Sequence, residues 1–216
     1  RDDVESRGLG DVYKRQTTIL QATNDVTTYF TVLLFILMVA LPVLTMKLFS
    51  EERKMRTEQL LLTAPVSIAK IVAAKFFAAF TVFFGANLLC SLAYITLFIY
   101  SEPEGGIILG NIIAITLVGA SFIAVGIFVS SLTENQLAAA IGTFGILLAM
   151  LGVGLLSAVI PWYPVRYVLG WFSILTRYSN FTSGFFDFAA LFYYASVCFI
   201  FLFLTCRVLE RRRYSA

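Results

Sequence analysis

Five apolar stretches run through this chain, and each is long enough to cross a lipid bilayer as a helix. A helix needs about 20 residues to cross a hydrocarbon core about 30 Å thick. None of the stretches alternates with period two, as a membrane β-strand would. Backbone groups in hydrocarbon must also be paired within their own segment. The sequence therefore predicts an all-α, polytopic transmembrane helical bundle, with spans at Tyr29–Met46, Ile71–Tyr100, Ile107–Val129, Leu137–Ile160 and Ala189–Cys206.

Composition supports a membrane protein. The 216 residues are 59% hydrophobic and 13% charged, whereas a soluble domain is about 45–50% apolar and about 25% charged. A chain of this length cannot bury so much apolar surface in a water-soluble core. Membrane lipids are therefore expected around the spans.

The basic residues between the spans predict the orientation of the chain. Successive loops alternate sides, and cytoplasmic loops carry an excess of Lys and Arg. With residues 1–16 set aside, one side holds Arg166 and Arg177 only. We therefore expect the 47–70 segment, the 130–136 turn and the C-terminus to be cytoplasmic, because their side holds Lys47, Arg53, Lys54, Arg56, Lys70, Lys75, Arg207, Arg211, Arg212 and Arg213.

The first sixteen residues, RDDVESRGLGDVYKRQ, are polar and unlike anything that follows. Such a stretch is typical of sequence that does not belong to the fold. We interpret residues 1–16 as non-native and 17–216 as the membrane domain, with the natural N-terminus further upstream.

Several kinds of chemistry have no support in the sequence. There is no histidine, and Cys90, Cys198 and Cys206 lie inside apolar runs without metal-site spacing. No Gly-Lys pair exists, so the chain has no phosphate-binding loop for ATP. The central parts of the spans hold no Asp, Glu, Lys, Arg or His, which argues against an ion-driven transporter. We therefore expect no enzyme, no metal, no cofactor and no nucleic-acid partner.

Small and polar residues within the spans predict helix packing. Ala120 with Ala124, Ala138 with Gly142, and Gly154 with Ala158 have the spacing that lets helices approach closely in lipid. Asn87 and Asn111 are interpreted as interhelical hydrogen-bonding groups, with contact to a substrate as the alternative.

The segment from Lys47 to Lys70 is charged and reads as one helix. Ser50 is the expected N-cap, which puts Glu51 and Glu52 in the first turn. Glu52 and Arg56 are four residues apart and are expected to pair. Leu48, Met55 and Leu62 mark one apolar stripe, and Pro65 stops the helix. Patterning alone leaves two interpretations, a helix that docks in a partner's cleft and a helix that lies on lipid headgroups.

The run PVLTMKLFSEERKMRTEQLLLTAPVS resembles the sequence of ABC-2 type transporter permeases, and most closely the gliding-motility type. The turn Ser130 to Gln136 and the ending, with Phe185, Asp187 and the Tyr193–Tyr194 pair before a basic tail, are similar too. The family commonly has Gly where this chain has Arg56. It also has six spans, so the resemblance implies that the first span is missing. The residues that carry it are Pro42, Thr45, Met46, Glu51, Glu52, Arg53, Thr57, Glu58, Leu60, Leu61, Thr63, Pro65, Val66 and Ser67.

The resemblance implies a permease subunit of an ATP-binding-cassette exporter in the bacterial cytoplasmic membrane. Its partners would be a cytoplasmic ABC ATPase subunit and a second permease subunit, identical or not. A membrane scaffold that recruits a cytoplasmic partner without transport is the alternative. The helix after the first span would be a coupling helix that docks on the ATPase, through Glu51, Glu52, Arg53, Arg56, Thr57, Glu58, Leu61 and Pro65.

The 161–188 segment would match the family's extracellular re-entrant helices. Its aromatic residues would lie at the outer membrane interface, as gate residues or as simple anchors. Asp187 is expected to cap a helix or to add polarity there rather than to catalyse a reaction. The candidate outer-gate or interface residues are Trp162, Tyr163, Trp171, Phe172 and Asp187.

Overall fold

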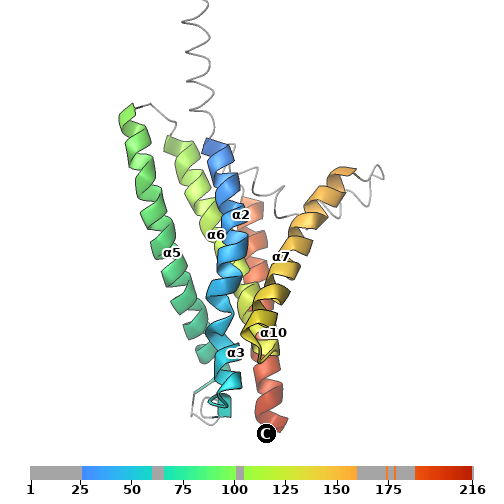
Figure 1. Ribbon diagram of the computed structural model, residues 1–216. Coiled ribbons are helices and arrows are strands. Elements are labelled where there is room, and N and C mark those ends of the chain that lie inside the picture. The colour runs from blue at the N-terminus through green and yellow to red at the C-terminus, as the bar shows by residue number, and fades with distance from the viewer. Residues whose placement is uncertain are drawn as a thin grey trace, which may run out of the picture.

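The computed structural model describes residues 26–59, 66–100, 105–159, 174, 178 and 188–215. Every regular element among these residues is a helix, so the predicted all-α class is confirmed (Figure 1). The bounds of the helices are α2 Val26–Thr45, α3 Lys47–Lys54, α5 Ile68–Tyr100, α6 Gly105–Leu132, α7 Gln136–Val159 and α10 Phe188–Ser215.

In the part of the chain that the structure describes, five helices are long and apolar enough to cross a membrane, as the sequence predicted. They correspond to α2 continued by α3, then α5, α6, α7 and α10. The helices extend past most of the predicted apolar stretches. The largest extension is in α10, which stays helical through its basic end to Ser215, whereas the prediction stopped at Cys206.

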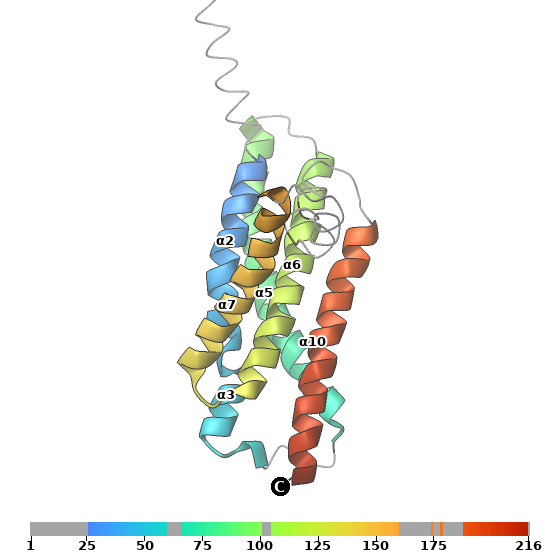
Figure 2. The same ribbon diagram turned by 90° about the vertical axis from the view of Figure 1, so that its right-hand side faces the viewer.

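Helix α6 is the central element of the bundle. In the most apolar part of α6, 67% of the residues are buried inside the bundle. The corresponding share in the other four spans is 22–33%. Ala114, Ile115 and Ile123 on α6 are fully buried. The other spans pack around α6, and Figure 2 shows it between α2, α7 and α10.

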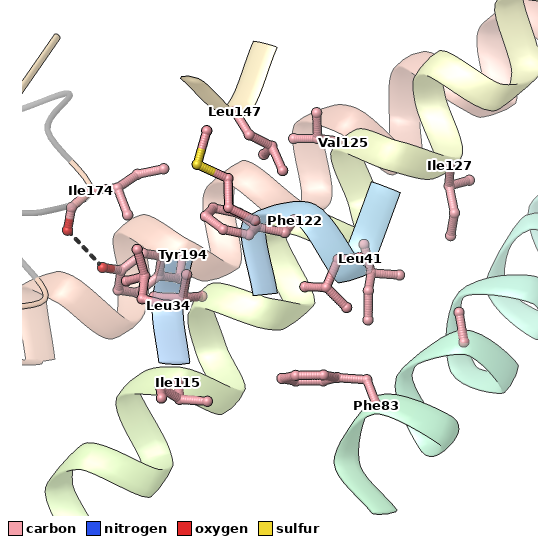
Figure 3. Close-up of a cluster of buried hydrophobic side chains, with 14 of the residues drawn as sticks. Leu34, Leu41, Phe83, Ile115, Phe122, Val125, Ile127, Leu147, Ile174 and Tyr194 are labelled. Carbon is pink, nitrogen blue, oxygen red and sulfur yellow. Dashed lines mark hydrogen bonds between the residues drawn. The ribbon is translucent and has the colours of Figure 1, made fainter. Parts of the chain in front are cut away.

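Each of the other four spans contributes at least two large side chains to the core around α6. Among the described residues, Tyr194 and Phe122 are the largest fully buried side chains. Figure 3 shows these two close to Leu34 and Leu41 of α2 and Leu147 of α7. Outward-facing positions are apolar as well, such as Phe35, Val39, Phe192 and Phe199, which suits a surface that lies against lipid acyl chains.

Two glycines of α6 allow its closest helix contacts. A Cβ at Gly119 would lie 2.2 Å from the Phe83 ring, and one at Gly126 would lie 2.1 Å from Thr45 Oγ1. The small-residue pairs noted in the sequence do not include either glycine. Of those pairs, Gly142 makes a moderately close contact, where an added Cβ would lie 3.1 Å from Val129.

Asn87 forms the interhelical hydrogen bond that the sequence predicted. Its Nδ2 donates to Thr116 Oγ1 of α6 at 3.0 Å. Asn111 is also on α6 and is fully buried.

Only Ile174 and Tyr178 are described from the aromatic segment that precedes α10, and both are buried. The Tyr194 hydroxyl of α10 donates to the Ile174 carbonyl at 3.1 Å, which ties this segment to the bundle (Figure 3). The candidate outer-gate residues Trp162, Tyr163, Trp171, Phe172 and Asp187 lie outside the described residues, as do residues 1–16. Those interpretations stay predictions.

Candidate functional site

Helix α3 continues α2 with almost no break. Met46 is the only residue between the two helices, and its N–H donates to the Pro42 carbonyl at 2.9 Å. Thr45 is completely buried, and its hydroxyl donates to the Leu41 carbonyl at 2.9 Å. Helix α3 therefore extends the first span at one end of the bundle. The C-terminus lies at the same end (Figure 1), which is here called the α3 end.

The first turn of α3 is capped by a side chain of another helix. Ser130 of α6 accepts hydrogen bonds from the N–H groups of Phe49 and Ser50, both at 3.1 Å. Its hydroxyl donates to the Met46 carbonyl at 3.0 Å. The hydroxyl thus uses its full bonding capacity and pairs two N–H groups that a helix start leaves open.

The prediction that Ser50 is the N-cap is therefore wrong. Ser50 lies inside α3, is buried, and donates its own hydroxyl to the Met46 carbonyl. The local rule failed because α2 runs directly into α3. The chain never leaves helical geometry at Ser50, and Glu51 and Glu52 lie beyond the first turn.

Helix α3 ends in a Schellman motif. The Thr57 N–H donates to the Glu52 carbonyl at 2.9 Å, and the Arg56 N–H to the Arg53 carbonyl at 3.1 Å. Arg56 has φ of 57°, the left-handed conformation that this motif requires. The permease family that the sequence resembles commonly has Gly at this position, and Gly adopts the conformation without the cost of about 1–2 kcal/mol that a Cβ adds.

The predicted length of this helix is also wrong. The helix stops at Lys54 rather than continuing to Pro65, because the left-handed turn at Arg56 reverses the chain. The expected apolar stripe is broken as well, since Leu48 is half-buried against the bundle while Met55 is 67% exposed on the turn. Leu61, Leu62 and Pro65 lie outside the described residues.

Glu52 pairs with a neighbouring span instead of with Arg56. Its carboxylate lies 2.6 Å from Lys75 Nζ of α5. The same ammonium group donates to the Leu48 carbonyl and lies 4.5 Å from the centre of the Phe49 ring. Lys75 therefore contacts three residues of α3 and fixes it against the start of α5.

Two more ion pairs connect the segment to the rest of the α3 end. Arg53 lies 2.9 Å from Glu134 in the turn between α6 and α7, and it donates to the Leu132 carbonyl at 2.8 Å. Glu58 lies 3.1 Å from Arg212 at the end of α10, and both side chains are three-quarters or more buried. Three acidic or basic residues of the 47–59 segment thus reach three different parts of the bundle.

The turn beyond α3 faces outward. Lys54, Met55, Arg56 and Thr57 are all exposed. We call these four residues the α3 tip. Glu51, on the last turn of α3, is half-buried, and it has no ion pair with any described residue. An exposed methionine flanked by cations on a fixed turn has the character of a protein-binding surface.

Sequence patterns did not predict which residues hold this segment in place. Ser130, Lys75, Glu134 and Arg212 were noted only for their spans, turn or charge. One signal was available, since the turn that contains Ser130 and Glu134 belongs to the resemblance. The partners of α3 could have been sought there.

Comparison with known families gives a match to the ABC-2 family transporter protein over residues 6–212. Nearly the whole chain is covered, so the chain belongs to this family of transporter membrane proteins. No curated protein and no solved structure matches it. The family is a membrane domain without an ATPase domain, which implies an ATPase partner in general.

Proposed function

We propose that the chain is the permease subunit of an ATP-binding-cassette exporter, of the gliding-motility type, and that its α3 tip docks on a separate ATPase subunit. The chain lies in the cytoplasmic membrane of a bacterium with the α3 end inside. A second permease subunit completes the transport path. Family membership supports the class of transporter, and the geometry of the α3 end supports the place of docking.

One observation carries this proposal. The α3 tip is exposed, while the residues on either side of it are ion-paired to α5, to the α6–α7 turn and to α10. These ion pairs join the segment to three separate parts of the bundle, so they fix its position. A displacement of the tip would be passed to three other parts of the bundle as well as to α2.

This arrangement changes the roles expected of the charged residues. Glu52, Arg53 and Glu58 hold the segment in place, whereas Lys54, Met55 and Arg56 face a partner, with Thr57 beside them. When ATP binding closes the ATPase subunits, the bound tip would move with them. The ion pairs and the direct continuation into α2 would then convert that movement into a change between the spans.

Charge distribution supports the orientation. With residues 1–16 set aside, ten Lys and Arg residues belong to the α3 side of the alternating loops and two to the other side. Such an excess is typical of the cytoplasmic face, where an ATPase subunit and its ATP are found.

The test is retention of the ATPase subunit by a Met55→Asp variant during purification of the complex. A charge in the centre of a docking surface should reduce retention at least tenfold, as loss of a central contact of 1.4 kcal/mol or more does. Leu137→Asp is the matched control, because Leu137 is 68% exposed against 67% for Met55 and lies in the first turn of α7 at the same end of the bundle. Equal retention by both variants would place docking away from the tip.

A further inference from the structure

The α3 end carries more positive than negative charge. Its loops and helix ends hold ten Lys and Arg residues against five acidic residues, which are Glu51, Glu52, Glu58, Glu134 and Glu210. Four of these five carboxylates are ion-paired with Lys or Arg side chains of the chain itself, at 2.6–3.4 Å. Ion pairing therefore uses most of the negative charge within the chain and leaves cations in excess.

The α3 tip belongs to this excess. Lys54 and Arg56 are exposed, and the tip contains no acidic residue. The preceding turn of α3 adds one exposed cation, Lys47, and one half-buried carboxylate, Glu51, four residues apart on one face of the helix. Residues 60–65, which follow the segment, contain no charged side chain. The tip and this turn thus present three cations and one carboxylate, a net charge of +2.

The two cations of the tip are not used inside the chain. Neither Lys54 nor Arg56 forms an ion pair with a described residue, whereas Glu52, Arg53 and Glu58 all do. Arg56 also has a φ of 57°, a conformation that Gly adopts without strain. A cation at this position has a conformational cost and no internal partner among the described residues, so its charge is available to another molecule.

The tip lies far enough from the apolar layer for a soluble protein to reach it. The apolar run of α10 ends at Cys206, and six further residues lead to Arg212, a rise of about 9 Å along a helix. The headgroup layer on each side of a bilayer is about 5–8 Å thick. Glu58 follows the tip directly and pairs with Arg212, which puts the tip at the outer edge of the headgroups.

We propose that the ATPase surface that receives the α3 tip is acidic, with carboxylates that face Lys54 and Arg56 on either side of a contact for Met55. This inference rests on the proposed docking and adds the chemistry of the partner surface. Complementary charge speeds the encounter of two proteins, and like charge at the same place disfavours wrong partners. An ATPase subunit with a basic docking surface would therefore be rejected by this permease.

The test measures the affinity of the ATPase subunit for the full chain in nanodiscs of phosphatidylcholine, a lipid without net charge. Lys54→Gln and Arg56→Gln each remove one cation, and each should weaken binding about threefold to fivefold. Raising the salt concentration from about 0.05 M to about 0.5 M should weaken binding of the original chain, and the double variant should lose most of this dependence. Lys70→Gln is the matched control, because Lys70 is exposed in the first turn of α5 and lies outside the tip.

Arg56→Gly separates the charge from folding. Gly suits the left-handed turn, so this variant should melt at or above the temperature of the original chain and yet bind as weakly as Arg56→Gln. Unchanged affinity in the Lys54 and Arg56 variants, together with the loss of retention in Met55→Asp, would overturn the acidic surface and leave docking at the tip intact. Cations that serve lipid headgroups would give that result. Equal weakening by Lys70→Gln would also overturn the proposal, whereas normal retention of Met55→Asp would remove the docking itself.

Discussion

Replacing Gly126 by alanine should lower the free energy of unfolding by about 3 kcal/mol, because overpacking in a close-packed contact costs about 1–3 kcal/mol or more. The new Cβ would lie 2.1 Å from Thr45 Oγ1 and 2.7 Å from Thr45 Cβ. Thr45 cannot turn away easily, since it is completely buried, is β-branched and has its hydroxyl bonded to the Leu41 carbonyl. The backbones of α2 and α6 would have to separate instead.

Gly145→Ala is the matched control for this change. Gly145 also lies within a spanning helix, α7, but a Cβ there would meet nothing within 4 Å. The same added methyl group should raise stability there by up to about 1 kcal/mol, since alanine favours helix more than glycine does. Unfolding of both variants in detergent micelles by denaturant measures the difference. If Gly126→Ala were as stable as the original chain, α2 and α6 would not be in the close contact described above.

Ser130→Ala should lower the free energy of unfolding by about 2 kcal/mol and loosen α3. The substitution removes the acceptor of the Phe49 and Ser50 N–H groups and the donor to the Met46 carbonyl. Phe49 and Ser50 are buried, so water cannot readily replace the lost bonds, and an unpaired buried group costs about 1–3 kcal/mol. Hydrogen exchange at these two amides should become faster.

Ser131→Ala is the control for the serine hydroxyl. Ser131 is equally buried, but its hydroxyl donates at 2.7 Å to the Phe128 carbonyl of its own helix. Its loss should cost less than about 1 kcal/mol and should leave exchange at Phe49 and Ser50 unchanged. Equal exchange rates in the two variants would mean that Ser130 does not cap α3.

The spans could be predicted from the sequence because length and polarity decide them. The arrangement of the spans around α6 could not be predicted in this way. The most apolar parts of the first span and of α6 have nearly the same mean hydropathy, 2.5 and 2.6. Yet 33% of the residues are buried in the first span and 67% in α6. In lipid both the packed and the exposed faces of a helix are apolar, so hydrophobic periodicity does not distinguish them.

The sequence predicted which segment forms the candidate site, but not which residues that segment contacts. Charge and resemblance identified the segment Lys47 to Lys70. Rules for residues a few positions apart could not find the partner of Glu58, which pairs with a residue 154 positions away. The pairing of Glu52 with Arg56 failed because Arg56 adopts a left-handed conformation and leaves the helix. Arg56 stands where the family commonly has Gly. Only the backbone of the structure shows why Gly suits this position, since Arg56 adopts a positive φ there.

A photo-crosslinking amino acid at Met55 tests most directly whether the α3 tip contacts the ATPase subunit. The chain and its ATPase would be expressed together and irradiated in intact membranes. The matched position is Leu109, which is 63% exposed and lies near the opposite end of α6 from Ser130. We expect an adduct with the mass of the permease plus the ATPase from Met55 and none from Leu109. An adduct from Leu109 but none from Met55 would contradict both the docking site and the orientation.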